Sequence, residues 1–373
     1  MKLKKLLGRM ACIVALAATC TACGDDNDAV NWNEGAAVEL PRERIFILNQ
    51  GNWNSNDATL TFYDPQATGT VDKVVGDIYL AQNGKKLGDT GQAMIAYRDD
   101  LYIVVSGSKY IARLNGAGVE QCRYAFTAEQ GDPRYLAAED GKIYVSLWSG
   151  VVMRLDAETL QPEATVAVGS NPETLVIEDD KLYCVNCSYY TTVGNTVSVI
   201  DLATFKVAQT LTIFENPQRI VECNDRLFVQ GYGSTDYLNY TYPVAMLTPT
   251  VSSGAAYQEI GQATHMAAYG NTLYLAYSYT DWTTYVTTNT FWSYNTATGK
   301  RSDVSFLKNA PEELSSASIY MLEVNPENGD IYVGIAYYST SGKGDVYRFS
   351  SDGTFIESFE TGGQGPVDMV FLD

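Results

Sequence analysis

One short unit recurs along this chain, an aromatic residue flanked by apolar residues, and it has the composition of a β-strand. The unit occurs seven times, with neighbouring aromatic residues 39 to 58 positions apart. Repeats of about 40–50 residues that contain several short strands are typical of β-propeller blades. The sequence therefore predicts an all-β fold, a seven-bladed β-propeller, rather than a generic all-β protein with tyrosine-rich strands. The copies are Ile45-Phe46-Ile47, Leu101-Tyr102-Ile103, Ile143-Tyr144-Val145, Leu182-Tyr183-Cys184, Leu227-Phe228-Val229, Leu273-Tyr274-Leu275 and Ile331-Tyr332-Val333.

Turn signals precede six of the seven units, which makes each unit the second arm of a hairpin. Asp140-Gly141 is the clearest, because both residue types tolerate the positive φ angles of a two-residue turn. A third strand and a fourth strand are expected after each unit, so that every blade has four strands, A to D.

The two ends of the chain are expected to share one blade. No strand A precedes Ile45, whereas residues 365–371 at the C-terminus read as a strand A without a blade of its own. Pairing the C-terminal strand with the first unit would close the ring and leave no open sheet edge.

The N-terminus has the features of a bacterial lipoprotein signal. Residues 1–22 combine a basic start with an apolar run, and Thr21-Ala22-Cys23 resembles a lipobox in which Cys23 is lipidated after cleavage. The acidic run at 24–28 resembles a signal for export to the cell surface; a solvated tether is the alternative. We expect a signal peptide over 1–22, a flexible acidic tether over 23–43 and the propeller over 44–373. A plain secreted protein, cut after an Ala-x-Ala-like site, is the alternative to the lipoprotein.

Charge and cysteine content narrow the range of partners. The net charge is −19, and it is more negative without the basic N-terminus, which argues against nucleic acid and anionic lipid as partners. Cys184-x-x-Cys187 could suggest redox or metal chemistry, but Cys184 lies in a predicted strand, which favours a structural role.

The predicted topology separates two faces of the propeller. The A–B turns are short and lie on one face, whereas the often long B–C loops, such as the one expected over residues 277–290, lie on the other. Aromatic residues gather in these loops, where they offer large contact area at low entropic cost, so the loops are a candidate recognition surface. The alternative is that the rings pack loop against loop. The candidate platform comprises Trp53, Trp148, Tyr189, Tyr190, Tyr232, Tyr279 and Trp282.

Catalysis has little support in the sequence, and we expect a protein that is not an enzyme. His265 is the one histidine of the chain, so a histidine-rich metal site or a Ser-His-Asp triad is hard to build. Carboxylate chemistry of the glycosidase kind stays open, because acidic residues are plentiful. His265 begins a strand A near the central channel, where it is either a structural histidine or a contact to a ligand or a metal-bearing cofactor.

The chain resembles the YncE-like seven-bladed propellers of Bacteroidota from Ile45 to its end. The resemblance rests on repeats of the type Asn171-Pro172…Leu182-Tyr183…Asp201 and on the opening Leu48-Asn49-Gln50-Gly51-Asn52-Trp53. Within that group, the signal, acidic run, length and opening motif are similar to BtuG-type surface lipoproteins. Those proteins capture vitamin B12 and dock on a TonB-dependent cobalamin transporter.

The resemblance implies a lipid-anchored, surface-exposed outer-membrane protein that captures cobalamin or another cobamide. The cobamide would be a carried ligand rather than a cofactor, and no protein-bound metal is expected. A corrinoid is broad and rimmed by amides, so Asn52, Asn54 and Asn186 join His265 and the aromatic platform as candidate contacts. The alternatives are a glycan- or protein-binding surface propeller and, less favoured, a propeller enzyme.

Overall fold

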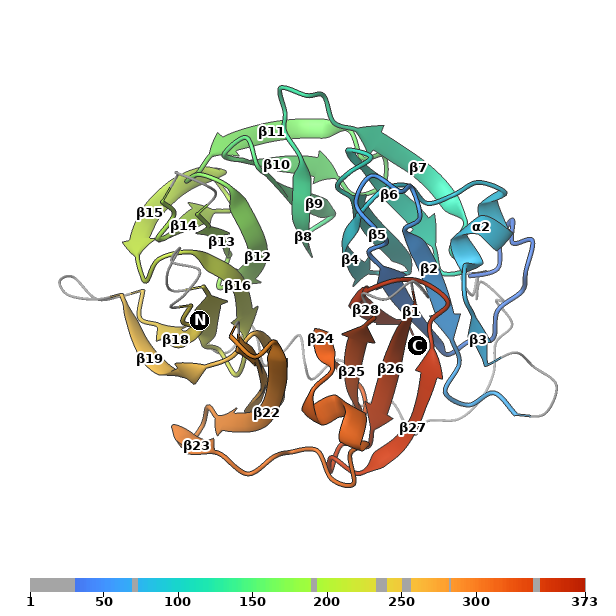
Figure 1. Ribbon diagram of the computed structural model, residues 1–373. Coiled ribbons are helices and arrows are strands. Elements are labelled where there is room, and N and C mark those ends of the chain that lie inside the picture. Colours follow the sequence, from blue (N-terminus) through green and yellow to red (C-terminus); the bar gives the residue numbers. More distant parts are fainter. Residues whose placement is uncertain are drawn as a thin grey trace, which may run out of the picture. The chain divides into compact units, whose positions relative to one another are not determined.

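Seven antiparallel sheets arranged around a common centre make up the computed structural model of the protein (Figure 1). The structure describes residues 31–68, 73–188, 193–232, 240–249, 256–281, 283–337 and 343–372. Each sheet is one blade of four strands, which confirms the predicted seven-bladed β-propeller.

The blades follow one another along the chain, and the innermost strand is given first for each. Blade 1 contains β28 (Pro366–Leu372), β1 (Arg44–Asn49), β2 (Thr59–Tyr63) and β3 (Val74–Val75). Blade 2 contains β4 (Gly91–Tyr97), β5 (Asp100–Val105), β6 (Tyr110–Asn115) and β7 (Glu120–Ala125). Blade 3 contains β8 (Pro133–Glu139), β9 (Lys142–Leu147), β10 (Val151–Asp156) and β11 (Pro162–Ala167).

The remaining four blades complete the circle. Blade 4 contains β12 (Pro172–Glu178), β13 (Lys181–Asn186), β14 (Thr196–Asp201) and β15 (Lys206–Thr212). Blade 5 contains β16 (Pro217–Glu222), β17 (Leu227–Gly231), β18 (Pro243–Leu247) and β19 (Tyr257–Gln262). Blade 6 contains β20 (His265–Tyr269), β21 (Thr272–Asp281), β22 (Val286–Asn295) and β23 (Lys300–Ser302). Blade 7 contains β24 (Ser318–Val324), β25 (Ile331–Ala336), β26 (Gly344–Phe349) and β27 (Phe355–Glu360).

The recurring sequence unit forms the second strand of every blade. In β1, β5, β9, β13, β17 and β25 its aromatic ring is buried, and in β21 Tyr274 is half-buried against the core. All three residues of a unit are apolar because neighbouring blades cover both faces of that strand, whereas a sheet with one face in water would alternate.

The turns that precede these strands adopt the backbone conformation that their residues predict. Asp179 and Asp180 have φ angles of 51° and 58°, and Asp140 and Gly141 have φ angles of 49° and 75°. Two consecutive residues in the left-handed region match the twist of the flanking strands, so the hairpins are tight.

Ring closure follows the prediction. β28 pairs with β1 in antiparallel register, with Ile45 opposite Phe371 and Ile47 opposite Met369. The expected strand over 365–371 begins and ends one residue later, at Pro366 and Leu372.

Three local features differ from the sequence-based expectations. Residues 277–290, predicted as a loop, continue β21 and β22 as a paired ribbon whose last pair is Asp281 with Val286. A short helix, α2 (Ile78–Asn83), follows β3 and was not predicted. The tether predicted over 23–43 is packed in its last part, because Leu40 is buried in the core and Arg44 donates to the Leu40 carbonyl oxygen over 2.9 Å.

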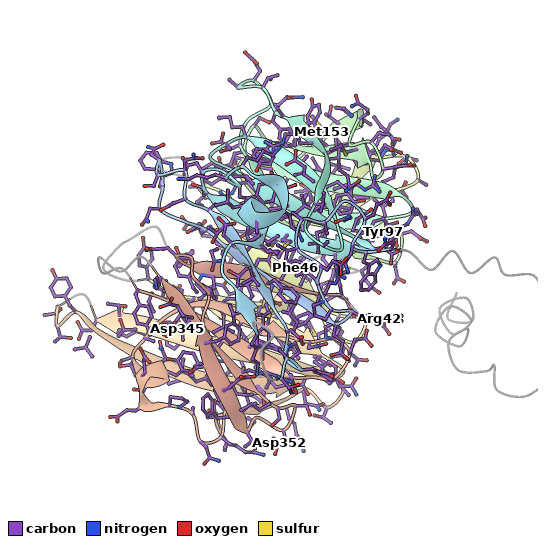
Figure 2. The ribbon with its side chains drawn as sticks, turned by 90° about the vertical axis from the view of Figure 1, so that its right-hand side faces the viewer. Arg42, Phe46, Tyr97, Met153, Asp345 and Asp352 are labelled. Carbon is purple, nitrogen blue, oxygen red and sulfur yellow. The ribbon has the colours of Figure 1, made fainter. Side chains whose placement is uncertain are left out.

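The two faces of the propeller differ in their connections. In the side view of Figure 2, Asp345, at the beginning of a third strand, and Tyr97, at the end of a first strand, lie toward opposite sides. We call the side where second strands end and third strands begin the long-loop face. The opposite side carries the tight A–B turns.

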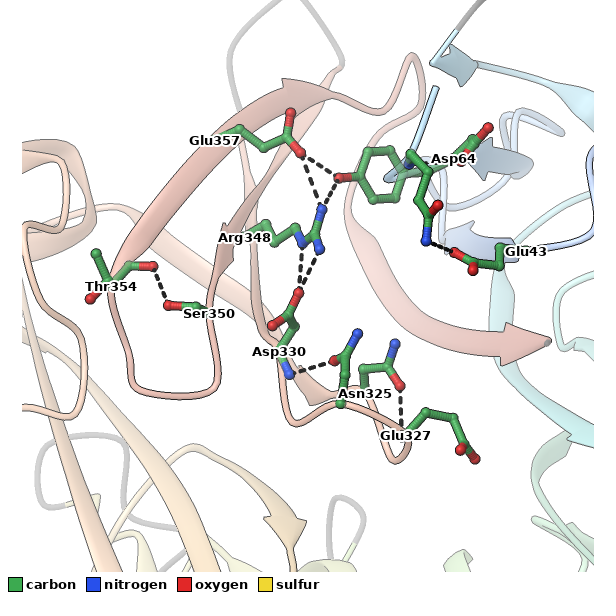
Figure 3. A network of polar contacts seen from close by, with 12 residues as sticks. Glu43, Asp64, Asn325, Glu327, Asp330, Arg348, Ser350, Thr354 and Glu357 are labelled. Carbon is green, nitrogen blue, oxygen red and sulfur yellow. Dashed lines mark hydrogen bonds and ion pairs between the residues drawn. The ribbon is translucent and has the colours of Figure 1, made fainter. Parts of the chain in front are cut away.

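A polar latch joins blade 7 to blade 1 near the A–B turn side (Figure 3). The Arg348 guanidinium donates to the Asp330 carboxylate over 2.6 and 2.9 Å and to the Tyr63 hydroxyl over 3.3 Å. That hydroxyl donates to Glu357 over 2.6 Å, and Lys73 forms a 2.6 Å ion pair with the same carboxylate. Burial, the hydrogen bond to Glu357 and its charge raise the pKa of Tyr63, so the hydroxyl stays a donor.

Replacing Arg348 by methionine is expected to lower the free energy of unfolding by about 3 kcal/mol. The Arg348 and Asp330 side chains are only 15% and 11% exposed, so the variant leaves a carboxylate without its partner in a poorly solvated place. Chemical denaturation followed by tryptophan fluorescence measures the change.

Lys308→Met is the matched control, because the Lys308–Asp352 ion pair is 56% and 63% exposed. An exposed pair contributes less than about 1 kcal/mol. Equal losses in the two variants would contradict the assignment of the latch.

Candidate ligand-binding site

A small pocket opens on the long-loop face, where the two ends of the propeller chain meet. It has a volume of about 170 Å³, and Trp53 beside it is 80% exposed. The Gln50 and Gly51 amides donate to the carbonyl oxygens of Gly365 and Gln364 over 2.8 and 3.0 Å, so ring closure itself shapes the pocket. The lining residues are Gln50, Gly51, Asn52, Trp53, Tyr320, Ala336, Gln364 and Gly365.

The loop that carries Trp53 is held by two carboxylates, Asp57 within the loop and Asp89 from the segment before β4. Asp57 accepts from the backbone N–H of Asn52 over 2.7 Å and from the Asn52 side-chain amide over 2.9 Å. Asp89 accepts from the backbone N–H of Asn54 over 3.0 Å. Asn54 has a φ angle of 61°, which asparagine tolerates better than most residues. The loop therefore presents an exposed indole on a fixed backbone.

Trp148 belongs to a paired polar cluster around the central channel. Its Nε1 donates to Glu173 over 2.8 Å, and the Arg134 guanidinium lies 4.3 Å from the ring centroid. Arg134 also donates to Glu173 over 3.1 and 3.2 Å and to Gln92 over 2.8 Å. Each charge in this cluster has a partner.

Asn186 does not reach the surface. It is 1% exposed, and its side-chain amide donates to the hydroxyls of Thr196 and Ser198 over 2.9 and 3.1 Å. Asn49 does the same at the end of β1, toward Thr59 and Thr61. The asparagine that ends these two second strands thus ties the blade together, and Asn186 is buried.

Five tyrosines form an arc of successive ring contacts across blades 5 and 6. We call Tyr232, Tyr240, Tyr242, Tyr277 and Tyr279 the tyrosine arc. Neighbouring centroids are 5.9 Å apart for Tyr232 and Tyr240, 5.2 Å for Tyr232 and Tyr242, 5.8 Å for Tyr242 and Tyr277, and 6.2 Å for Tyr277 and Tyr279. Tyr232 and Tyr279 are 37% and 44% exposed.

The tyrosine arc combines loop residues with strand residues. Tyr277 and Tyr279 stand on β21, in the extended ribbon that replaces the expected loop. Residues two apart on a strand share a face, which brings both rings to one side. Tyr242 was missed by the sequence analysis, although its neighbourhood, Tyr240-Thr241-Tyr242, alternates as a strand edge does.

Bulges interrupt six of the seven innermost strands, and all but one of the residues that the register skips are polar. The strand register skips Gln92 in β4, Arg134 and Tyr135 in β8, and Gln218 in β16; the skipped residues in the other three are Glu173, Thr174, Tyr320 and Val367. A bulge changes the direction of the side chains that it contains relative to the rest of the strand. Apart from Tyr320 and Val367, a Gly or Pro at the strand start followed directly by polar residues was the sequence signal that could have identified them.

His265 begins β20, the innermost strand of blade 6. Its Nδ1 is 3.1 Å from the Thr264 hydroxyl. Burial, and then the charge of Arg219, lower the pKa of His265 to about 3, so the imidazole is neutral at physiological pH.

Two carboxyl groups of the channel are held at unusual pKa values. Burial, and then the charge of Asp368, raise the pKa of Glu323 to about 8, against the opposing effect of Arg219. Burial also raises the pKa of Asp368, but the Met94 and Met369 amides donate to its carboxylate over 2.7 and 2.9 Å and favour the charged form. At neutral pH Glu323 is therefore protonated and Asp368 is ionised.

Four predicted sites fall outside the described residues: Cys23, Tyr189, Tyr190 and Trp282. The buried thiols of Cys184 and Cys187 have raised pKa values, because burial disfavours the thiolate, and this fits a structural role. Within the described ranges no group of three or more histidine, cysteine or acidic side chains could hold a metal ion. In the same part of the chain, no helix has the length and apolar character needed to cross a membrane.

The class of protein that this geometry defines is a seven-bladed β-propeller with aromatic and amide groups on one face and polar side chains in its channel. Residues 43–363 match the family described as "Domain of unknown function (DUF5074)", and the chain belongs to that family. The comparison with curated proteins finds no match.

Solved structures of distant proteins share the fold. Hydrazine synthase of Kuenenia stuttgartiensis is 15% identical, with 70% of this chain and 77% of that chain covered and a TM-score of 0.56. Apo AztD from Citrobacter koseri is 9% identical, with 90% and 99% covered and a TM-score of 0.52. A protein of unknown function from Bacteroides caccae is 9% identical, with 88% and 99% covered and a TM-score of 0.50. At these identities the likeness concerns the fold alone.

Replacing Glu323 by glutamine is expected to stabilise the protein at alkaline pH. A folded-state pKa above the unfolded value means that the stability contributed by this group is present below about pH 4 and lost as the pH rises toward 8. The variant cannot ionise, so its free energy of unfolding should exceed that of the unaltered protein by about 1–2 kcal/mol at pH 8, after allowance for solvent screening. Denaturation at a series of pH values measures the difference.

Glu259→Gln is the control, since Glu259 is an exposed carboxyl on β19. It should change stability little at any pH. A difference between the Glu323 variant and the parent that stays constant from pH 5 to 8 would refute the raised pKa.

Proposed function

We propose that the long-loop face binds a cobamide such as vitamin B12. The observation that carries the proposal is the tyrosine arc, which offers a continuous row of rings on that face, with Tyr279 44% exposed. Tyrosine rings give large contact area at a low cost in side-chain entropy and suit the apolar edges of a corrinoid. The resemblance to BtuG-type lipoproteins supports the choice of ligand.

The pocket beside Trp53 complements this platform with amide groups. Gln50, Asn52 and Gln364 line it, and amides can both donate to and accept from the amide rim of a corrinoid. Pockets for drug-sized molecules typically measure about 300–1,000 Å³. A pocket of about 170 Å³ is therefore suited to one substituent, with the macrocycle lying across the face above it.

In this proposal the protein is a surface lipoprotein of the outer membrane. The lipid on Cys23 would anchor the chain, and the propeller would pass its cobamide to a TonB-dependent transporter. The supporting features are the lipobox-like Thr21-Ala22-Cys23 and the acidic run that follows it. The strongly negative net charge of −19 agrees with a domain held away from anionic lipid.

Alanine variants on the two faces test the binding site. Calorimetric titration of the detergent-solubilised protein with cyanocobalamin should show binding. Trp53→Ala and Tyr279→Ala should each weaken it by about 2 kcal/mol, roughly thirtyfold, because a central aromatic anchor is lost.

Lys142→Ala and Asn224→Ala serve as controls, since both residues lie at the A–B turns of the opposite face. They should leave the affinity unchanged. Similar small effects on both faces would refute the site. A parent protein that binds no cobamide but binds a glycan would replace the proposal with the glycan-binding alternative.

Lipid anchoring has its own test. Cys23→Ala should move the protein from the membrane fraction to the soluble fraction and abolish labelling with a lipid precursor, because the acceptor thiol is lost. Replacing Asp25, Asp26 and Asp28 together by asparagine should keep the protein in the membrane but protect it from protease added to whole cells. A Cys23→Ala protein that stays lipid-labelled would contradict the anchor.

A further inference from the structure

Three polar side chains on innermost strands have no hydrogen-bond or ion-pair partner in the part of the chain that the structure describes. The Arg219 guanidinium, the Tyr135 hydroxyl and the Glu323 carboxyl make no hydrogen bond and no ion pair within the described part of the chain. They come from β16, β8 and β24, three different blades. All three are half-buried, so each has lost part of its solvation without gaining a protein contact.

The strand registers place these groups in adjacent layers of the channel. Arg219 pairs with Gln230 and Asp368 with Leu48, and both partners directly follow the recurring unit of their strands. These residues and His265, which pairs with Ala276 in the same position of β21, therefore lie at one level. Glu323 pairs with the aromatic residue of the unit in β25, which lies two residues closer to the A–B turn than the position just described. Glu323 is therefore about 7 Å deeper in the channel than the level of Arg219.

Electrostatics supports the same placement. Groups on β8, β24 and β28 lie close enough to Arg219 to influence its pKa. The hydroxyl of Tyr232, in the tyrosine arc, does so as well. Innermost strands of opposite blades approach one another only at the centre of the ring (Figure 1). Arg219 thus lies in the channel mouth, beside one end of the tyrosine arc.

The neighbouring Arg134 cluster shows that the lack of partners is not general. Arg134 occupies the corresponding region of blade 3 and uses Glu173, Gln92 and the Trp148 ring. An arginine has five N–H donors, and an unpaired one in a partly desolvated place costs stability. A side chain that remains unpaired despite this loss of stability is a candidate for contact with a ligand.

The charges around Arg219 define the chemistry of that ligand group. Asp368 is held ionised by two backbone amides, His265 is neutral and Glu323 carries a proton, so the cluster has almost no net charge. A full anion would gain from Arg219 but be repelled by Asp368, and a cation would meet the reverse. A neutral group that accepts at one end and donates at the other satisfies both.

We propose that the channel mouth binds a primary carboxamide of the ligand, whose carbonyl oxygen accepts from Arg219 and whose NH₂ group donates to Glu323 or Asp368. The Tyr135 hydroxyl lies in the bulge of β8 next to this layer and supplies a further hydrogen bond. This inference rests on the proposed function, and it assigns to the channel one of the amide arms that rim a corrinoid. The tyrosine arc then contacts the corrin ring, while the channel residues bind one amide arm of the ligand.

Hydrolysed ligands test the inference on the unaltered, detergent-solubilised full chain. Cyanocobalamin is compared by calorimetry with its separate monocarboxylic acid derivatives, in each of which one amide has become a carboxylate. One derivative, the one whose altered arm enters the channel, should bind at least tenfold more weakly, while the others bind like the parent compound. Equal affinities for all derivatives would overturn the inference.

Substitutions in the channel provide the second arm. Arg219→Met should weaken cyanocobalamin binding at least tenfold and remove the discrimination between the amide and the sensitive carboxylate. Tyr135→Phe removes only a hydroxyl and should cost about threefold to tenfold, about 1 kcal/mol as for one hydrogen bond. Lys142→Ala is the control, and thermal melting confirms that each variant is folded.

The outcomes separate the two proposals. If cyanocobalamin binds and the face variants weaken it, but Arg219→Met and Tyr135→Phe bind like the parent, the carboxamide site is wrong and the proposed function stands. If the unaltered protein binds no cobamide, the proposed function fails and the carboxamide inference fails with it.

Discussion

The antiparallel pairing of β28 with β1 is the interaction on which the rest of the structure depends. A ring of blades has an open edge wherever it is not closed, and here the closing strand is the last one in the chain. The closure also brings Gln364 and Gly365 against Gln50 and Gly51, and all four residues line the pocket beside Trp53. Stability and the candidate site therefore share one set of backbone hydrogen bonds.

The seam between blade 7 and blade 1 is built differently at its two ends. At the A–B turn side, the latch of Arg348, Asp330 and Tyr63 is fully paired and joins blade 7 to blade 1. At the long-loop face, the same seam exposes an indole and leaves amide side chains around a pocket. The amides at the pocket are themselves anchored, because the Tyr320 hydroxyl donates to the Gln50 side chain over 2.7 Å and the Asn52 side chain donates to Asp57 over 2.9 Å. The seam therefore has a fully paired polar latch on the A–B turn side and, on the long-loop face, a pocket whose polar lining is held in place.

The repeated architecture was predictable from the sequence, because it depends on local composition. Apolar-aromatic-apolar strands such as Ile143-Tyr144-Val145 and turns such as Asp179-Asp180 specify their own conformation, and their spacing specifies the number of blades. The predicted loop at 277–290 was wrong for a related reason. Its Thr and Tyr residues have strand propensity, but the sequence contains no signal for where the ribbon leaves the blade. Asn186 was included in the candidate site as an amide that could bond to the rim of a corrinoid, whereas the tertiary structure buries it as it buries Asn49.

The channel residues were beyond sequence reasoning because no local pattern brings them together. Tyr135, Arg219 and Glu323 lie 84 and 104 residues apart along the chain, and they meet only because the ring brings the innermost strands of three blades toward one centre. A charged side chain that stood alone would be neutralised by a shifted pKa or by a partner, as Arg134 is by Glu173. Arg219 has no such ion pair within the described residues. The ionised carboxylate near it, Asp368, already accepts from two backbone amides, and the other carboxyl group, Glu323, is protonated. A cluster of this kind would select a ligand group by hydrogen-bond pattern rather than by charge, in keeping with the carboxamide site that we propose next to the tyrosine arc.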